Sequence, residues 1–176
     1  MKVKINRRTT QHQGRVFKIV TENVTLPGGI TADIDILQHP GAAAIVPFKN
    51  DHQVILIKQY RHALRDTIWE IPAGTLNGGE SAIQCAKREL VEETGFSSDK
   101  WQDLGFITPV PGYSDERVHI FMATGLTPAP QNLDEDEILD VHVIDFREAI
   151  DMIHRGEIRD AKTISGLLLA HHRRGG

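Results

Sequence analysis

Residues 74–96 have the sequence GTLNGGESAIQCAKRELVEETGF, a glycine-rich loop followed by a segment that favours a helix. Ser81 and Gln84 have the spacing of a capping box, which predicts that the helix begins at Ala82. Gly95 stands where a left-handed C-terminal cap belongs, so the helix is expected to end at Thr94. The glycines at 74, 78 and 79 disfavour a strand or a helix before it.

Three glutamates share one side of this predicted helix. At about 100° per residue, Glu89 and Glu93 lie about 40° apart, and Glu92 lies about 60° from Glu89 on the other side. Like charges at this spacing repel, and the C-terminal end of a helix already carries partial negative charge. Glu93 also borders the apolar face, where an unpaired carboxylate is costly. A divalent cation relieves all of these penalties, and oxygen ligands without His or Cys favour Mg²⁺ or Mn²⁺. The alternative is a solvated acidic surface.

The rest of the chain predicts an α/β fold, with a mixed sheet flanked by helices. Apolar runs predict strands at residues 16–20, 23–26, 30–37, 42–48, 54–60, 104–108, 118–124 and 141–146. Helical spacing of apolar residues predicts helices at 147–154 and 163–172. We expect an antiparallel hairpin of 42–48 with 54–60 across the polar turn 49–52. Residues before about 40 are expected to form a separate small antiparallel sheet.

Length and composition exclude several classes of protein. The 176 residues fit one domain with at most a small appendage, and the net charge is −4, from 20 basic and 24 acidic residues. A nucleic-acid partner is therefore not expected. Cys85 is the single cysteine, which excludes an intrachain disulfide and favours a reducing compartment. Residues 1–13 are charged and polar without the apolar core of a secretory signal, and no apolar run approaches the roughly 20 residues that span a bilayer. We therefore expect a cytoplasmic protein without a membrane partner.

The quoted stretch resembles a known family. Gly74, Glu80 and the run 88–96 match the Nudix box, G-x5-E-x7-R-E-U-x-E-E-x-G-U, at every specified position. Residues 69–73 (WEIPA) and 111–116 (PGYSDE) resemble flanking signatures of the ADP-ribose pyrophosphatase branch. The resemblance implies a Nudix fold, with residues 41–176 as the hydrolase domain. It also implies that residues 1–40 are β-strands that help to form a homodimer.

The resemblance assigns a metal site to the box. Metal ions would bridge the pyrophosphate of the substrate while a water molecule attacks a phosphorus. Glu92 is either a further ligand or an acid that positions this water. The implied ligands are Ala73 (through its carbonyl), Glu89, Glu92 and Glu93, and the implied supporting residues are Gly74, Glu80 and Arg88.

A general base is expected on an acidic loop beyond the box. In the branch this role often falls to a glutamate ahead of the last strand, and residues 134–137 (DEDE) are four consecutive acids at that place. We favour Glu135, with Glu137 as the second candidate. The alternative is a mobile acidic surface loop without a catalytic role.

Substrate contacts are implied at three further positions. Arg61 matches a phosphate-contacting arginine of the branch, with Arg65 as a weaker alternative. Tyr113 and Glu116 are expected to flank the terminal sugar. Stacking on the base is open to two aromatic residues for which a place in the core is the stronger expectation: Phe17 and Trp69.

The function expected from this resemblance is divalent-metal-dependent hydrolysis of ADP-ribose or a related nucleoside diphosphate sugar. The products of ADP-ribose would be AMP and ribose 5-phosphate. Rival substrates are GDP-mannose and dinucleoside polyphosphates. An alternative of a different class is a nucleotide-sensing module that keeps the fold without the chemistry, although intact glutamates argue against it.

Overall fold

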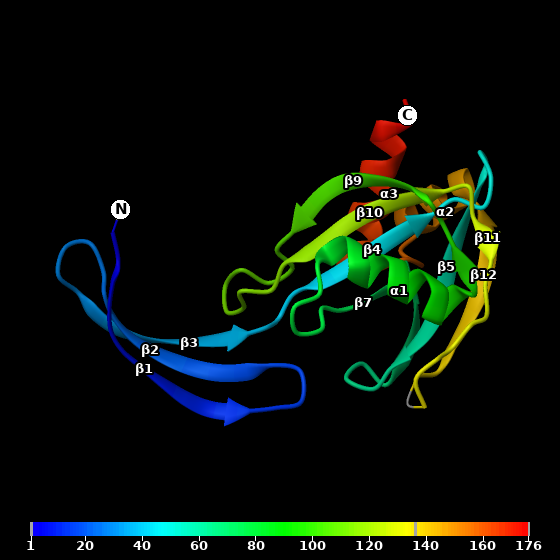
Figure 1. Ribbon diagram of the computed structural model, residues 1–176. Coiled ribbons are helices and arrows are strands. Elements are labelled where there is room, and N and C mark those ends of the chain that lie inside the picture. Colours follow the sequence, from blue (N-terminus) through cyan, green and yellow to red (C-terminus); the bar gives the residue numbers. More distant parts are fainter. Residues whose placement is uncertain (1, 136, 176) are drawn as a thin grey trace.

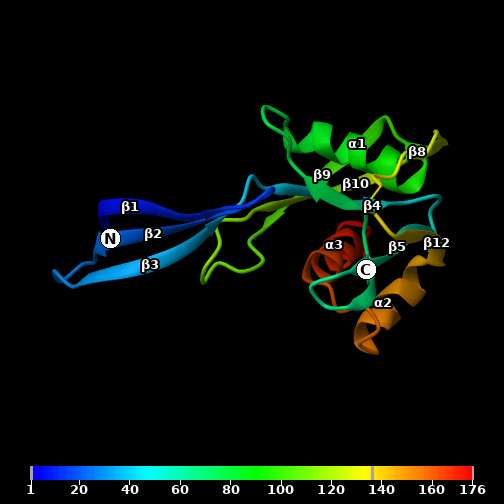
Figure 2. The same cartoon turned by 90° about the horizontal axis from the view of Figure 1, so that it is seen from below.

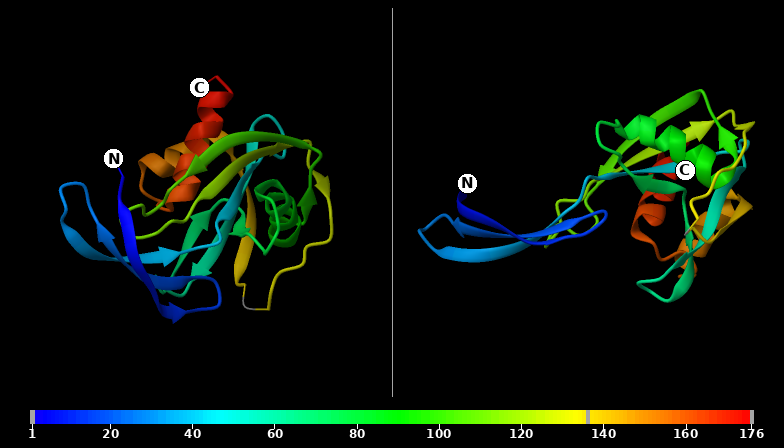
Figure 3. Two further views of the ribbon diagram at one scale, coloured as in Figure 1. Left: turned by 60° about the vertical axis from the view of Figure 1, so that its left-hand side comes forward. Right: turned by 60° about the horizontal axis from the view of Figure 1, so that its bottom comes forward.

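The chain folds into a projecting arm and a larger body (Figure 1). The structure is a computed structural model, and it describes residues 2–135 and 137–175. The arm is an antiparallel sheet of order β1-β2-β3. Its strands are β1 (Lys4–Gln13), β2 (Lys18–Thr25) and β3 (Thr31–Gln38). The right-hand view of Figure 3 shows this curved sheet projecting from the body.

The arm confirms the separate small sheet and corrects two details of its strands. The strands expected at 16–20 and 23–26 are parts of one strand, β2, on which Val20 and Val24 are buried. β1 was not predicted, because nine of its ten residues are polar and all ten are exposed, so the segment carries no apolar alternation. Arg8 on β1 donates a hydrogen bond of 2.7 Å to the buried Glu22 on β2.

Two sheets form the centre of the body. One has the order β7-β4-β10-β9, with β4 and β10 parallel, and the other has the order β12-β5-β6. A short pair, β8 with β11, lies beside them. The strands are β4 (Ala42–Pro47), β5 (Gln53–Arg61), β6 (Asp66–Glu70), β7 (Ala73–Thr75), β8 (Phe96–Ser97), β9 (Lys100–Ile107), β10 (Val118–Thr124), β11 (Thr127–Pro128) and β12 (Leu139–Asp145).

The expected hairpin of 42–48 with 54–60 is wrong. β4 and β5 belong to different sheets and meet in the part of the chain described here through one isolated bridge, Phe48 to Val54. Each strand instead pairs with a partner from the second half of the chain, β4 with β10 and β5 with β12. The polar turn 49–52 thus carries the chain from one sheet to the other.

Helices cover both faces of the four-stranded sheet, as Figure 2 shows. They are α1 (Ala82–Thr94), α2 (Phe146–His154) and α3 (Ala161–Arg173). Ala43 and Ile45 of β4 pack towards α1, whereas Ala44 and Val46 belong to a larger cluster on the face of β4 that α3 covers. Every residue of β4 is buried, as expected for a central strand covered on both faces. The mixed α/β architecture predicted from the sequence is confirmed.

Both ends of α1 lie where the sequence places them. The Gln84 side chain accepts a hydrogen bond of 2.9 Å from the backbone N–H of Ser81. Gly95 has a φ of 71°, and its N–H donates to the carbonyl of Val91 at 3.0 Å. Among the residues described, no helix has the length and apolar character needed to cross a bilayer.

Candidate active site

The glycine-rich loop lies against the acidic side of α1. A Cβ atom added to Gly74 would lie 1.6 Å from Oε1 of Glu89, so the loop approaches this carboxylate more closely than any other residue type permits. Gly74 belongs to β7, which pairs with β4 in the centre of the body. The sheet therefore fixes the backbone beside Glu89.

Glu93 is tied to the same loop one residue earlier. The backbone N–H of Ala73 donates a hydrogen bond of 2.8 Å to Oε2 of Glu93. The Glu93 side chain is buried, at 1% exposed. Residues 73 and 74 thus each contact one of the two glutamates to which the sequence assigned a metal.

Arg88 gathers the remaining acids of the box. Its Nη1 atom lies 2.6 Å from Glu89 and 2.8 Å from Glu92, and its Nε atom lies 3.0 Å from Glu80. Nη2 also donates to the carbonyl of Thr75 at 3.2 Å. The hydrogen bonds to Glu80 are the main reason that the pKa of Arg88 is raised. One guanidinium thereby joins the loop to the helix.

Burial works against the charged forms of two glutamates. It raises the pKa of Glu93 to about 8, with the negative charge of Glu89 adding to the effect. It also raises the pKa of Glu89 to about 7, although Arg88 opposes the shift. Two carboxylates with little solvent and too little positive charge nearby are a site that a cation would stabilise.

The donor set fits a divalent ion. Carboxylate oxygens and a backbone carbonyl are hard ligands of the kind that Mg²⁺ and Mn²⁺ prefer. Within residues 2–135 and 137–175, no three His, Cys, Asp or Glu side chains are already grouped as a complete metal site. In the present arrangement Arg88 forms ion pairs with Glu89 and Glu92, and the N–H of Ala73 donates a hydrogen bond to Glu93.

The acidic segment before β12 is attached to the C-terminal end of α1. Gln131 donates a hydrogen bond of 2.6 Å to the carbonyl of Glu93, and the N–H of Asn132 donates to the carbonyl of Glu92 at 3.2 Å. Glu137 is half-buried, and its charge adds to the raised pKa values of the two buried box glutamates. Glu135 is exposed, and Asp136 lies outside the described residues.

A family model described as NUDIX domain matches residues 38–167. The chain belongs to the Nudix family. The methanol dehydrogenase activator of Bacillus methanolicus is 39% identical over 153 residues, which cover 86% of this chain and 83% of that protein. The ADP-ribose pyrophosphatase of Bacillus subtilis (strain 168) is 38% identical over 152 residues, which cover 85% and 82%. A crystal structure of ADP compounds hydrolase shares the fold with a TM-score of 0.86 and 24% identity, covering 98% of this chain and 94% of that chain.

Arg61 lies beside the Nudix box but is paired with an acid that the sequence analysis did not single out. Its Nε and Nη2 atoms donate hydrogen bonds of 2.6 and 2.7 Å to the two carboxylate oxygens of Glu70, which also contacts Lys162. Glu70 is 1% exposed. The position of Glu70 within the apolar run 68–71 was a sequence signal that could have identified it as a buried acid. The weaker alternative, Arg65, lies exposed in the turn between β5 and β6.

Tyr113 and Glu116 lie where the arm joins the body. The carbonyl of Tyr113 accepts a hydrogen bond of 2.8 Å from the N–H of Leu37 on β3, and the Tyr113 side chain is exposed. Glu116 lies 3.7 Å from Nδ1 of His39. These two residues therefore border the junction rather than the acidic side of α1.

The two aromatic residues considered for base stacking have different surroundings. Phe17 is not in the core, because it precedes β2 on the exposed arm, where it lines a hollow of about 410 Å³ with His39 and Asp115. Trp69 is half-buried, with the Lys58 ammonium 5.4 Å from its ring and the His142 ring 4.8 Å away. Phe17 thus borders a hollow at the arm–body junction.

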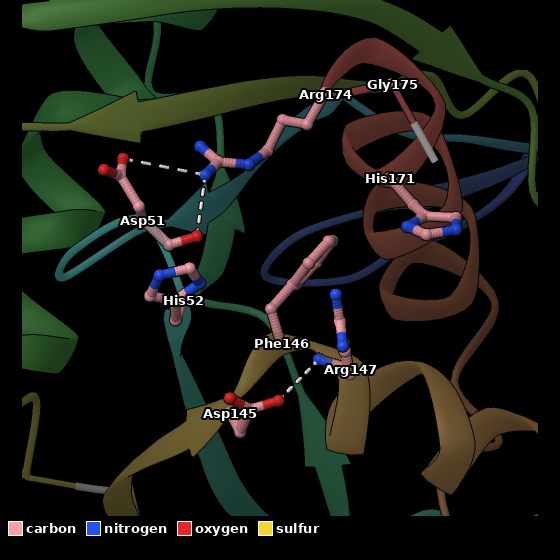
Figure 4. Close-up of a pocket in the computed structure, with 8 residues that line it drawn as sticks. All are labelled: Asp51, His52, Asp145, Phe146, Arg147, His171, Arg174 and Gly175. Carbon is pink, nitrogen blue, oxygen red and sulfur yellow. Dashed lines mark hydrogen bonds and ion pairs between the residues drawn. The ribbon is translucent and has the colours of Figure 1, made fainter.

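A second hollow, shown in Figure 4, is separate from the predicted site residues. It lies between the β4–β5 turn, the start of α2 and the end of α3. Arg174 there donates to the carbonyl of Asp51 at 2.8 Å and lies 4.2 Å from the centre of the Phe48 ring. Asp145 accepts a hydrogen bond of 2.9 Å from the N–H of Arg147 and so caps α2. Arg174 and Asp145 thus serve the local structure around this hollow.

Proposed function

We propose that the protein hydrolyses the pyrophosphate bond of ADP-ribose or a related nucleoside diphosphate sugar in a reaction that depends on a divalent metal. The products would be a nucleoside monophosphate and a sugar phosphate. The observation that carries this proposal is the pair of buried carboxylates, Glu89 and Glu93, held against the loop 73–74. The similarity to an ADP-ribose pyrophosphatase supports the class of substrate.

The metal in this proposal is Mg²⁺, with Mn²⁺ as a substitute. Its ligands would be the carbonyl of Ala73 and the carboxylates of Glu89, Glu92 and Glu93. A bound divalent ion neutralises charge on the diphosphate oxygens and lowers the pKa of a water molecule. The close approach of Gly74 to Glu89 and the burial of Glu93, which the hydrogen bond from Ala73 offsets only in part, support the assignment.

The chain itself would supply placement and proton transfer. Arg88 orients Glu89 and Glu92 through its hydrogen bonds, and Glu80 holds Arg88 in turn. A glutamate of the segment before β12 accepts the proton of the attacking water. Its electrostatic effect on the box glutamates favours Glu137 over Glu135 for this role.

The substrate would lie between the box and the arm–body junction. Arg61 contacts the diphosphate, because its charge lies close enough to Glu93 for each to influence the pKa of the other. Tyr113 and Glu116 flank the terminal sugar. Phe17 offers an exposed aromatic ring at the junction for stacking on the base.

A homodimer formed through the arm, residues 1–40, is part of the proposal. The arm exposes Ile5, Ile30 and Ile34, which are large apolar side chains that a second copy would cover. Sedimentation velocity of the parent and of Ile34→Asp tests this, with a dimer expected for the parent and a shift towards monomer for the variant. The single cysteine supports a cytoplasmic location.

The experiment that tests the function is incubation of the purified protein with ADP-ribose and Mg²⁺ in ¹⁸O-labelled water. We expect AMP and ribose 5-phosphate, with ¹⁸O in the product whose phosphorus was attacked, and no reaction in excess EDTA. GDP-mannose, NAD⁺ and a dinucleoside polyphosphate complete the panel. Absence of product across the panel rejects the proposal, and saturable binding without turnover favours the nucleotide-sensing module.

A further inference from the structure

Glu70 is held from two sides by positive charges. Arg61 contributes two hydrogen bonds, from Nε at 2.6 Å and from Nη2 at 2.7 Å, and the Nζ atom of Lys162 contacts Oε2 of the same carboxylate. The Glu70 side chain is 1% exposed and that of Lys162 is 15% exposed. Burial alone would raise the pKa of Glu70, but Arg61 and Lys162 outweigh this and lower it. Glu70 is therefore a buried, ionised carboxylate whose charge is offset by Arg61 and Lys162 together.

Lys162 comes from the first turn of α3, which is itself anchored to the segment that leads into the box. Asp160 accepts hydrogen bonds from Nζ of Lys162 at 3.1 Å and from Oγ1 of Thr163 at 2.6 Å. Oγ1 of Thr163 accepts in turn a hydrogen bond of 2.9 Å from the N–H of Ile71. The first turn of α3 thus fixes the residue that follows Glu70, two positions before Ala73.

The charges of this cluster balance only when Lys162 is present. It holds two cations, Arg61 and Lys162, and two carboxylates, Glu70 and Asp160. Without Lys162 the cluster would carry a net negative charge close to where a diphosphate binds in the proposed function. Arg61 uses its Nε and Nη2 atoms on Glu70, while its side chain remains 40% exposed. The Arg61 side chain is therefore still partly accessible to a ligand.

We propose that Lys162 is a positioning residue, which acts through Glu70 to hold Arg61 in place for the diphosphate of the substrate. This inference rests on the proposed function for the identity of the substrate. Glu70 sets the plane of the Arg61 guanidinium, because the two groups share two parallel hydrogen bonds. Lys162 also offsets the charge of Glu70, so that Arg61 remains attractive to a phosphate.

The test compares Lys162→Met and Lys162→Arg with the parent in steady-state hydrolysis of ADP-ribose with Mg²⁺. Since Arg61 would meet the diphosphate in the ground state and the transition state alike, Lys162→Met is expected to raise KM about tenfold and to change kcat by less than about threefold. Lys162→Arg restores the positive charge and is expected to return KM towards the parent value. Lys49→Met, which removes an exposed lysine from the β4–β5 turn, is the matched control and should leave both constants unchanged.

A purely structural role would lower the melting temperature and the active fraction of Lys162→Met without changing KM, and that result would overturn the inference. Should Lys162→Met not fold, Lys162→Gln keeps an N–H donor without the charge, and the same rise in KM is expected. Calorimetry with α,β-methylene-ADP-ribose separates the two proposals. If the parent binds this analogue without hydrolysing any substrate, and Lys162→Met binds it about tenfold more weakly, the inference holds although the proposed function fails. A parent that neither binds the analogue nor hydrolyses any substrate of the panel overturns both.

Discussion

The N–H of Ala73 and the carboxylate of Glu93 form a hydrogen bond of 2.8 Å between the start of β7 and the C-terminal half of α1. The next residue, Gly74, lies against Glu89. One short backbone segment therefore contacts both buried glutamates of the box. A substitution of either glutamate therefore changes the surroundings of the same backbone segment, residues 73–74, so single substitutions can test the site.

Glu93→Gln should abolish most of the hydrolysis while the fold is kept. A glutamine at this position can still accept the hydrogen bond from Ala73, but it lacks the charge that a divalent ion needs, so kcat should fall by at least about a hundredfold. Steady-state assays with ADP-ribose and Mg²⁺ measure the loss, and circular dichroism checks the fold. Glu157→Gln, at an exposed glutamate paired with Arg155, is the control. Turnover by Glu93→Gln at the parent rate would contradict the assignment.

The stability of the metal-free protein should fall as the pH rises from about 4.5 to about 8. Burial raises the pKa of Glu93 to about 8 and that of Glu89 to about 7, so the folded state holds more protons than the unfolded state across this range. The free energy of unfolding is therefore highest at the acidic end and is lost as the two groups ionise. Urea unfolding in EDTA at several pH values measures this.

Two comparisons isolate the source of that pH dependence. Glu93→Gln should flatten the decline, because it removes the more perturbed of the two groups. Saturating Mg²⁺ should also oppose the decline, since the ion binds the ionised carboxylates of the folded state. An identical decline in the parent and in Glu93→Gln would show that other groups cause it.

Local sequence signals predicted α1 and the Nudix box, but they could not predict which strands from distant parts of the chain pair with each other. The capping residues Ser81 and Gly95 lie within the element that they delimit, so its bounds followed from the sequence. The strands β4 and β5 are adjacent in sequence, and this suggested a hairpin, but burial of both required partners from β10 and β12. β1 was not predicted, because a wholly exposed strand does not show the alternation of apolar and polar residues that identifies a half-buried strand.

The residues of the candidate site likewise fall into those that local sequence predicts and those that only the fold brings together. Glu89 and Glu93 were predicted because helical spacing alone brings them together. The contact of Glu70 with Lys162 joins residues 92 positions apart, and only the fold of the whole body creates it. A lysine in a helical segment near the C-terminus gave no sign of it. The sequence singled out Arg61 through its resemblance to a phosphate-contacting arginine, but it did not show that a buried carboxylate holds this side chain.

Gly74→Ala should weaken the metal site, whereas Gly78→Ala should not. A Cβ atom at residue 74 would meet Oε1 of Glu89 at 1.6 Å, so this carboxylate must move away from the loop. Nothing lies within 4 Å of a Cβ atom at Gly78, in the same loop. We expect Gly74→Ala to lower kcat/KM by about tenfold or more and to weaken Mn²⁺ binding in calorimetry. Equal activity of the two variants would contradict the prediction that the metal site requires a glycine at residue 74.

Glu137→Gln and Glu135→Gln together identify the general base. The sequence favoured Glu135, but the charge of Glu137 contributes to the raised pKa values of Glu89 and Glu93, which favours Glu137 as the group nearer the reacting water. Loss of a general base lowers the rate by about 10² to 10⁴. We therefore expect a kcat loss of that size, and loss of the acidic limb of the pH–rate profile, in Glu137→Gln, with Mn²⁺ binding retained. A small effect there and a large one in Glu135→Gln would assign the role to Glu135, and small effects in both would place the base outside this segment.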